Sequence, residues 1–148
     1  MKRLKSRKTS IKSCKRSYNM TNEFLLYIGA SIIIIWGIAH IIPTKSIVEE
    51  FGEISEDNRR IITMEWLAEG ITFIFIGILV IFVTAFGDFL DLTPSIVYLC
   101  SAGILLIMAL LSLFTGARTS ILPMKICPII KFIVAILFII ATLVIEIP

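Results

Sequence analysis

Residues 64–86 read MEWLAEGITFIFIGILVIFVTAF, a stretch that is almost continuously apolar after Glu69. A helix that crosses the roughly 30 Å hydrocarbon core of a bilayer needs about 20 apolar residues, so this stretch is long enough to span. Its apolar residues are consecutive instead of alternating, which favours a helix over a strand of a membrane barrel. The sequence therefore predicts a membrane-spanning helix here.

Further apolar runs of similar length cover residues 24–42, 95–117 and 126–147, each bounded by proline, glycine or charge. The 148-residue chain is 57% hydrophobic with a mean hydropathy of +0.97, which is too apolar for an ordinary soluble domain. We therefore predict an all-α integral membrane protein, a multi-pass four-helix bundle over residues 23–148, located in the cell membrane and surrounded by the lipid bilayer.

Residues 1–22 carry many lysines and arginines and no acidic residue. We expect a disordered tail that suits an anionic membrane surface, with Met20 as an alternative start of translation. A signal peptide cleaved near Ala39 is the competing interpretation of the first apolar run. No nucleic-acid partner is expected, because nothing downstream resembles a module that reads bases. The scattered cysteines, Cys14, Cys100 and Cys127, are interpreted as small hydrophobes.

Polar residues gather at one end of the predicted bundle. Because the spans alternate in direction, the ends of the first and third helices meet the starts of the second and fourth at one membrane face. The charged and titratable residues expected at this face are His40, Arg59, Arg60, Glu65, Glu69, Arg118, Lys125 and Lys131. The opposite face has Asp88, Asp91 and Glu146.

Glu69 is the most informative of these residues. It lies about one turn inside its span, where a carboxylate is costly without a partner, and Glu65 lies on the same side of the helix. We expect a proton-active or ligand-binding site with Glu69 at its centre, Glu65 and His40 as partners, and Lys131 as counter-charge. Less central candidates are Trp36, Arg59, Arg60 and Arg118.

A purely structural role is the alternative for each of these residues. Glu69 and Glu65 can stabilise a helix N-terminus, Lys131 can extend to the interface, and His40 can cap helix carbonyls. One histidine and two carboxylates make a poor transition-metal set, so no metal site is predicted. The sequence assigns neither a catalytic residue nor a cofactor.

The loop from Pro43 to Arg60 has apolar residues at helical spacing among acidic ones, namely Ile47, Val48, Phe51 and Ile54. This pattern predicts a short amphipathic helix that lies on the membrane surface above the polar face. A solvated loop helix is the alternative. Trp36 and Trp66 are expected either as anchors in the aromatic belt at the interface or as walls of a cavity, and the belt is favoured for Trp66.

Two motifs, WGIAH at 36–40 and EWLAEG at 65–70 with the helix that follows to Gly77, resemble the DoxX-like family of small four-helix membrane proteins. The resemblance covers about residues 26–86. His40 departs from the common family pattern, in which a polar residue and a lysine follow the glycine. The resemblance implies a membrane subunit or partner of a quinone-linked redox system, with a quinone or another lipid-soluble ligand and a protein partner or a second copy of the chain.

Two other functions remain open. A small proton-coupled transporter would depend on Glu69. A membrane isomerase resembling the emopamil-binding family would use a histidine and a glutamate on neighbouring helices to move a proton.

Overall fold

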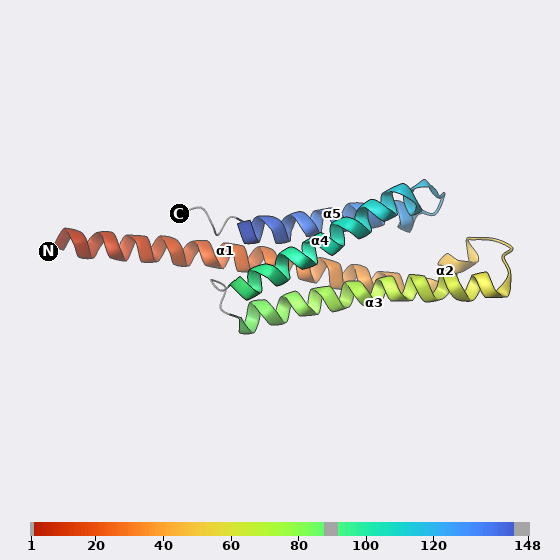
Figure 1. Ribbon diagram of the computed structural model, residues 1–148, viewed down its shortest axis with the longest axis horizontal. Coiled ribbons are helices and arrows are strands. Elements are labelled where there is room, and N and C mark those ends of the chain that lie inside the picture. Colours follow the sequence, from red (N-terminus) through yellow and green to blue (C-terminus); the bar gives the residue numbers. More distant parts are fainter. Residues whose placement is uncertain (1, 88–91, 144–148) are drawn as a thin grey trace.

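The computed structural model describes residues 2–87 and 92–143, with side chains from Met20 onward. These residues form helices and no strand (Figure 1). The elements are α1 (Lys2–Ile41), α2 (Thr44–Glu49), α3 (Glu56–Phe86), α4 (Leu92–Phe114), the 3₁₀ turn η1 (Gly116–Arg118) and α5 (Leu122–Leu143). The four segments long and apolar enough to cross a membrane are Met20–Ile41, Glu56–Phe86, Leu92–Arg118 and Leu122–Leu143, which confirms the predicted all-helical, multi-pass architecture.

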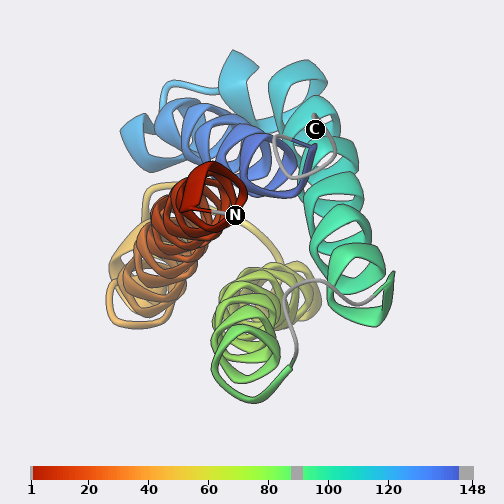
Figure 2. The ribbon, with the colours of Figure 1, turned by 90° about the vertical axis from the view of Figure 1, so that its left-hand side faces the viewer.

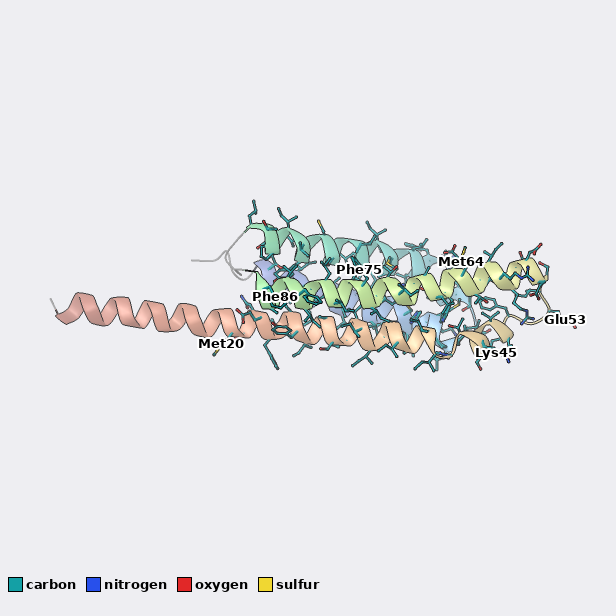
Figure 3. The ribbon with its side chains drawn as sticks, turned by 90° about the horizontal axis from the view of Figure 1, so that it is seen from below. Met20, Lys45, Glu53, Met64, Phe75 and Phe86 are labelled. Atoms are coloured by element: carbon teal, nitrogen blue, oxygen red, sulfur yellow. The ribbon has the colours of Figure 1, made fainter. Side chains whose placement is uncertain are left out.

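The outer surface of these helices is apolar. Side chains such as Met64 and Phe75 on α3 are 59% and 62% exposed (Figure 3). Similar residues on α4 and α5 include Ile107, 63% exposed, and Ile129, 57% exposed. A surface of this kind is unfavourable in water and favourable in hydrocarbon, which is consistent with contact with lipid.

The basic N-terminal segment differs from its prediction. In place of a disordered tail over 1–22, the structure has α1 continuing without a break from Lys2 (Figure 1). The segment has no proline or glycine before Gly29. A helix extended from an existing span avoids the cost of nucleation, which disfavours isolated helices.

Helix α3 begins before its apolar run. Ser55 is the N-cap and accepts a hydrogen bond from the Asn58 amide at 3.3 Å, and Glu56 and Asp57 occupy the first turn. Capping and negative charge at this end stabilise a helix that continues outside the hydrocarbon. At about 1.5 Å per residue, the 31 residues of α3 extend about 46 Å, which exceeds the hydrocarbon thickness.

The loop helix is shorter than the predicted amphipathic pattern. Helix α2 ends at Glu49, and Gly52 has φ of +75°, a conformation that glycine adopts readily and that cannot continue a helix. Ile47 and Val48 are buried, whereas Phe51 and Ile54 lie beyond the helix.

The helices pack in the order α3, α1, α5, α4, with α1 against α3 and α5 against both α1 and α4 (Figure 2). Contacts between α3 and α4 are sparse. All four long helices contribute to one core, which includes Ile33, Phe73, Leu105 and Phe138. This arrangement leaves the interval between α3 and α4 as the natural place for a cavity.

Two glycines bring α1 and α3 into backbone contact. A Cβ atom on Gly37 would lie 2.6 Å from the Gly70 carbonyl oxygen, and one on Gly70 would lie 3.0 Å from the Gly37 carbonyl oxygen. Small residues at helix crossings permit such approach and are a main source of helix association in lipid. The contact lies one turn from His40 and directly beside Glu69, so it sets the spacing of the polar site.

Some predicted positions lie outside the described residues. These are Asp88, Asp91 and Glu146 of the opposite face, the end of the fourth run beyond Leu143, and the side chain of Cys14.

Candidate functional site

Glu69 and Lys131 form an ion pair between α3 and α5. Lys131 is completely buried, and the Glu69 side chain is 25% exposed. The Lys131 ammonium also donates to Ser112 Oγ at 2.5 Å and to the Met108 carbonyl oxygen at 3.4 Å, both on α4. Three acceptors therefore match the three N–H groups of the lysine, which is the arrangement a buried ammonium requires.

His40 lies on the other side of the Glu69 carboxylate. Its Nε2 is 3.8 Å from Glu69 Oε2, and its side chain is 2% exposed. The ring stacks on Trp66 with centroids 4.7 Å apart and meets Phe73 edge-on at 5.3 Å. The last turn of α1 is thus held against α3 by aromatic contact, and the imidazole has little freedom to rotate.

The contact of the second ring nitrogen of His40 fixes the tautomer of the neutral ring. Nδ1 lies 3.1 Å from the Trp36 carbonyl oxygen one turn earlier in α1. A carbonyl only accepts, so this contact assigns the proton of the neutral ring to Nδ1. The lone pair of Nε2 therefore faces the interior of the site.

Cys127 is the residue that sequence reasoning missed. Its Sγ lies 3.4 Å from His40 Nε2 and 3.9 Å from Glu69 Oε1, and it accepts the Trp36 indole N–H at 3.5 Å. Cys127 is 3% exposed and belongs to the core, as predicted for a small hydrophobe. One sequence signal could have found it: Cys127 precedes Lys131 by four residues, which places both on one side of α5.

Trp66 differs from its predicted place in an interfacial belt. It is 6% exposed, and its indole N–H donates to the His40 carbonyl oxygen at 2.7 Å. That carbonyl is near the end of α1, where backbone oxygens lack helical partners. Thr44 Oγ1 donates to the same oxygen at 3.1 Å. The Trp66 indole therefore caps the C-terminus of α1 beside the site.

This contact makes a direct prediction. Replacing Trp66 with phenylalanine keeps the ring and removes the N–H donor, so we expect a loss of about 1 kcal/mol in the free energy of unfolding. SDS titration of the purified protein in mixed micelles, followed by circular dichroism, measures the change. Trp36→Phe is the comparison, and it should cost less because sulfur is a weak acceptor. Equal effects, or no effect at Trp66, would contradict the assigned contact.

A cavity of about 560 Å³ lies beside this cluster, between α3 and α4 with α5 behind them. Apolar side chains such as Ile61, Met108 and Leu111 line most of it. Its polar lining residues are Glu65, Glu69, Thr72, Ser112, Thr115 and Cys127. A mostly apolar cavity of several hundred Å³ with a few converging polar groups is typical of small-molecule sites.

The predicted site residues thus divide into two groups. Glu69, His40, Lys131 and Trp36 meet at the cluster, and Glu65 is exposed and lines the cavity one turn away. The three arginines lie outside the cluster. Arg60 pairs instead with Glu56 at 3.4 Å on the exposed first turns of α3, and Arg118 is exposed on η1.

No protein-family model, curated protein sequence or solved structure matches this chain.

Proposed function

We propose that this protein is a four-helix bundle that binds a lipid-soluble ligand with a polar head group, most specifically a quinone, at the cavity between α3 and α4. It would serve as a membrane subunit or partner of a quinone-linked redox system in the cell membrane, as the resemblance to the DoxX-like family implies. The observation that carries the proposal is the cavity itself, with apolar walls and a polar floor of Glu69, Ser112 and Cys127.

The chemistry of the floor suits a quinone. The carbonyl oxygens of a quinone accept hydrogen bonds, and the hydroxyl of Ser112 is a donor that lines the cavity. Glu69 also lines the cavity and can exchange a proton with a head group whose oxygens gain protons on reduction. The Lys131 ammonium donates to both Glu69 and Ser112 and stabilises negative charge beside them. Electrons would come from a partner protein.

The apolar walls suit a ligand that arrives through the bilayer. Helices α3 and α4 make few contacts with each other, and the cavity lies between them. An isoprenoid tail leaving by this interval would pass apolar side chains such as Ile61 and Leu111. We propose that α2 lies as a short amphipathic helix on the membrane surface, because Ile47 packs with Trp66 and Ile121 while Lys45 and Glu49 are exposed.

Binding of a short-chain quinone to the purified protein in lipid nanodiscs tests the proposal. Tryptophan fluorescence should be quenched saturably by decylubiquinone, because Trp66 lines the cavity. Glu69→Gln should weaken binding about tenfold, equivalent to about 1.4 kcal/mol, because it removes the carboxylate and its pairing with Lys131. Glu49→Gln is the matched control, since Glu49 is an exposed carboxylate on α2 away from the cavity. Quenching that does not saturate would reject quinone binding, and equal affinities in the two variants would reject the role of Glu69.

A membrane isomerase is the second candidate, favoured by one observation. His40 Nε2 and Glu69 Oε2 lie 3.8 Å apart on neighbouring helices, α1 and α3. Such a pair could add a proton to one carbon of a lipid double bond and remove a proton from the neighbouring allylic carbon, which shifts the double bond. Turnover of an added sterol by the purified protein, without any partner, distinguishes this function from the redox role.

A further inference from the structure

Three side chains of different chemistry converge in the cluster. The imidazole of His40, a carboxylate oxygen of Glu69 and the thiol sulfur of Cys127 come from α1, α3 and α5, and their ligand atoms all lie within 4.8 Å of one another. Each is a donor to zinc, for which thiolate, imidazole and carboxylate are the usual ligands. The prediction of no metal site counted one histidine and two carboxylates and did not include the thiol.

The orientation of His40 matches that of a metal ligand. Zinc-binding histidines usually donate the N–H of one ring nitrogen to a carbonyl or carboxylate, which fixes the ring and leaves the other nitrogen to bind the metal. In this protein, Nδ1 faces the Trp36 carbonyl oxygen at 3.1 Å, and Nε2 faces the Cys127 sulfur at 3.4 Å. Rings of Trp66 and Phe73 hold the imidazole in this orientation.

The carboxylate of Glu69 offers one oxygen on each side. Oε1 pairs with Lys131, while Oε2 lies 3.8 Å from His40 Nε2. A metal ion bound by Oε2 therefore leaves the ion pair with Lys131 in place. The lysine would then act as a second-sphere partner that orients the ligating carboxylate.

The spacing of the three groups is close to that of a tetrahedral site. Zinc bonds of about 2.0–2.3 Å at tetrahedral angles separate neighbouring ligand atoms by about 3.3–3.6 Å. The Sγ–Nε2 distance is 3.4 Å and the Nε2–Oε2 distance is 3.8 Å. The sulfur lies 3.9 Å from Oε1 of Glu69, and the three ligand atoms lie within 4.8 Å of one another, so the Glu69 side chain must move toward the other two ligands to close the site. This side chain is the least buried of the three.

We propose that His40, Glu69 and Cys127 form a zinc site whose fourth position opens to the cavity. Glu69 and Cys127 both line the cavity, so a fourth ligand reaches the ion from that side. Three protein ligands with one open position are characteristic of zinc sites that bind a water or a substrate. His40, the third protein ligand, is 2% exposed and lies on the side of the ion away from the cavity.

Charge balance specifies the fourth ligand. Zinc with the thiolate and the carboxylate is neutral, and Lys131 leaves one positive charge in the membrane interior. An isolated charge there is costly. An anionic fourth ligand, such as hydroxide or a deprotonated hydroxyl of a bound molecule, makes the whole cluster neutral.

Metal binding to the purified protein in nanodiscs tests the site directly. We expect one zinc ion per chain from zinc chloride, and an absorption band from thiolate-to-metal charge transfer when Co²⁺ replaces zinc. Cys127→Ser should abolish that band and raise the zinc Kd about 100-fold or more. The matched control is Cys100→Ser, since Cys100 is an exposed thiol on α4. A charge-transfer band that persists in Cys127→Ser, or zinc binding equal in the two variants, would overturn the proposal.

A second measurement uses the unaltered protein. Zinc should protect Cys127 from alkylation by a membrane-permeant maleimide, and Cys100 should react at the same rate with and without zinc, as read by mass spectrometry of the peptides. Equal alkylation of Cys127 in both conditions would also overturn the site. These experiments contain no quinone, so their outcome is independent of the proposed ligand of the cavity.

Discussion

Lys131→Met is expected to destabilise the protein by about 3–5 kcal/mol, because it leaves the Glu69 carboxylate in the interior without its counter-charge. Lys131 is 0% exposed and has the Glu69 carboxylate, Ser112 Oγ and the Met108 carbonyl as acceptors. Methionine fills a similar volume, so the effect reports the lost charge and donors instead of a cavity. SDS titration in mixed micelles measures the free energy of unfolding.

The controls for Lys131→Met use residues of α3 and α5, the two helices that carry Glu69 and Lys131. Lys125→Met removes an exposed lysine of α5 and should change stability by less than about 0.5 kcal/mol. The double variant Lys131→Met with Glu69→Gln removes both charges and should recover part of the loss, since replacing a whole buried pair costs less than breaking it. A double variant less stable than Lys131→Met would show that the pair does not account for the effect.

Gly37→Leu is expected to cost about 3 kcal/mol or more by forcing α1 away from α3. Even the first side-chain carbon at this position would lie 2.6 Å from the Gly70 carbonyl oxygen and 2.8 Å from Ile74 Cγ1. The obstacle is backbone, which cannot rotate aside as a flexible side chain can. Because His40 follows on the same helix, the variant should also separate the imidazole from Glu69 and Cys127.

Gly103→Leu is the matched control for Gly37→Leu. A Cβ atom on Gly103 meets no heavy atom within 4 Å, so leucine there extends into open space on α4. We expect stability to be unchanged or slightly increased, because glycine is a poor helix former. Disulfide trapping of cysteines placed on α1 and α3 reports the helix separation. Undisturbed trapping in Gly37→Leu would contradict the backbone contact.

The fold follows from properties that are local in the sequence. Long apolar runs such as 64–86 and 95–117 predict helices that cross lipid, because the backbone must satisfy its hydrogen bonds within the protein there and continuous apolar runs favour helices over barrel strands. The alternation of spans also predicts that His40, Glu69 and Lys131 share one membrane face, and the structure brings these three together. Continuation of α1 to Lys2 and the early start of α3 were missed, because charged and capping residues extend helices that hydropathy does not reveal.

Which polar atoms meet was decided by tertiary packing alone. Cys127 looked like a small hydrophobe, and Trp66 like an interfacial anchor, because a sequence shows the depth of a residue better than the direction its side chain faces. The close approach of α1 and α3 at Gly37 and Gly70, and the rotation of α5 that points Cys127 and Lys131 inward, bring them to His40 and Glu69. Depth in the membrane depends on the local apolar run, whereas contact between helices depends on side chains far apart in the chain that must fit together.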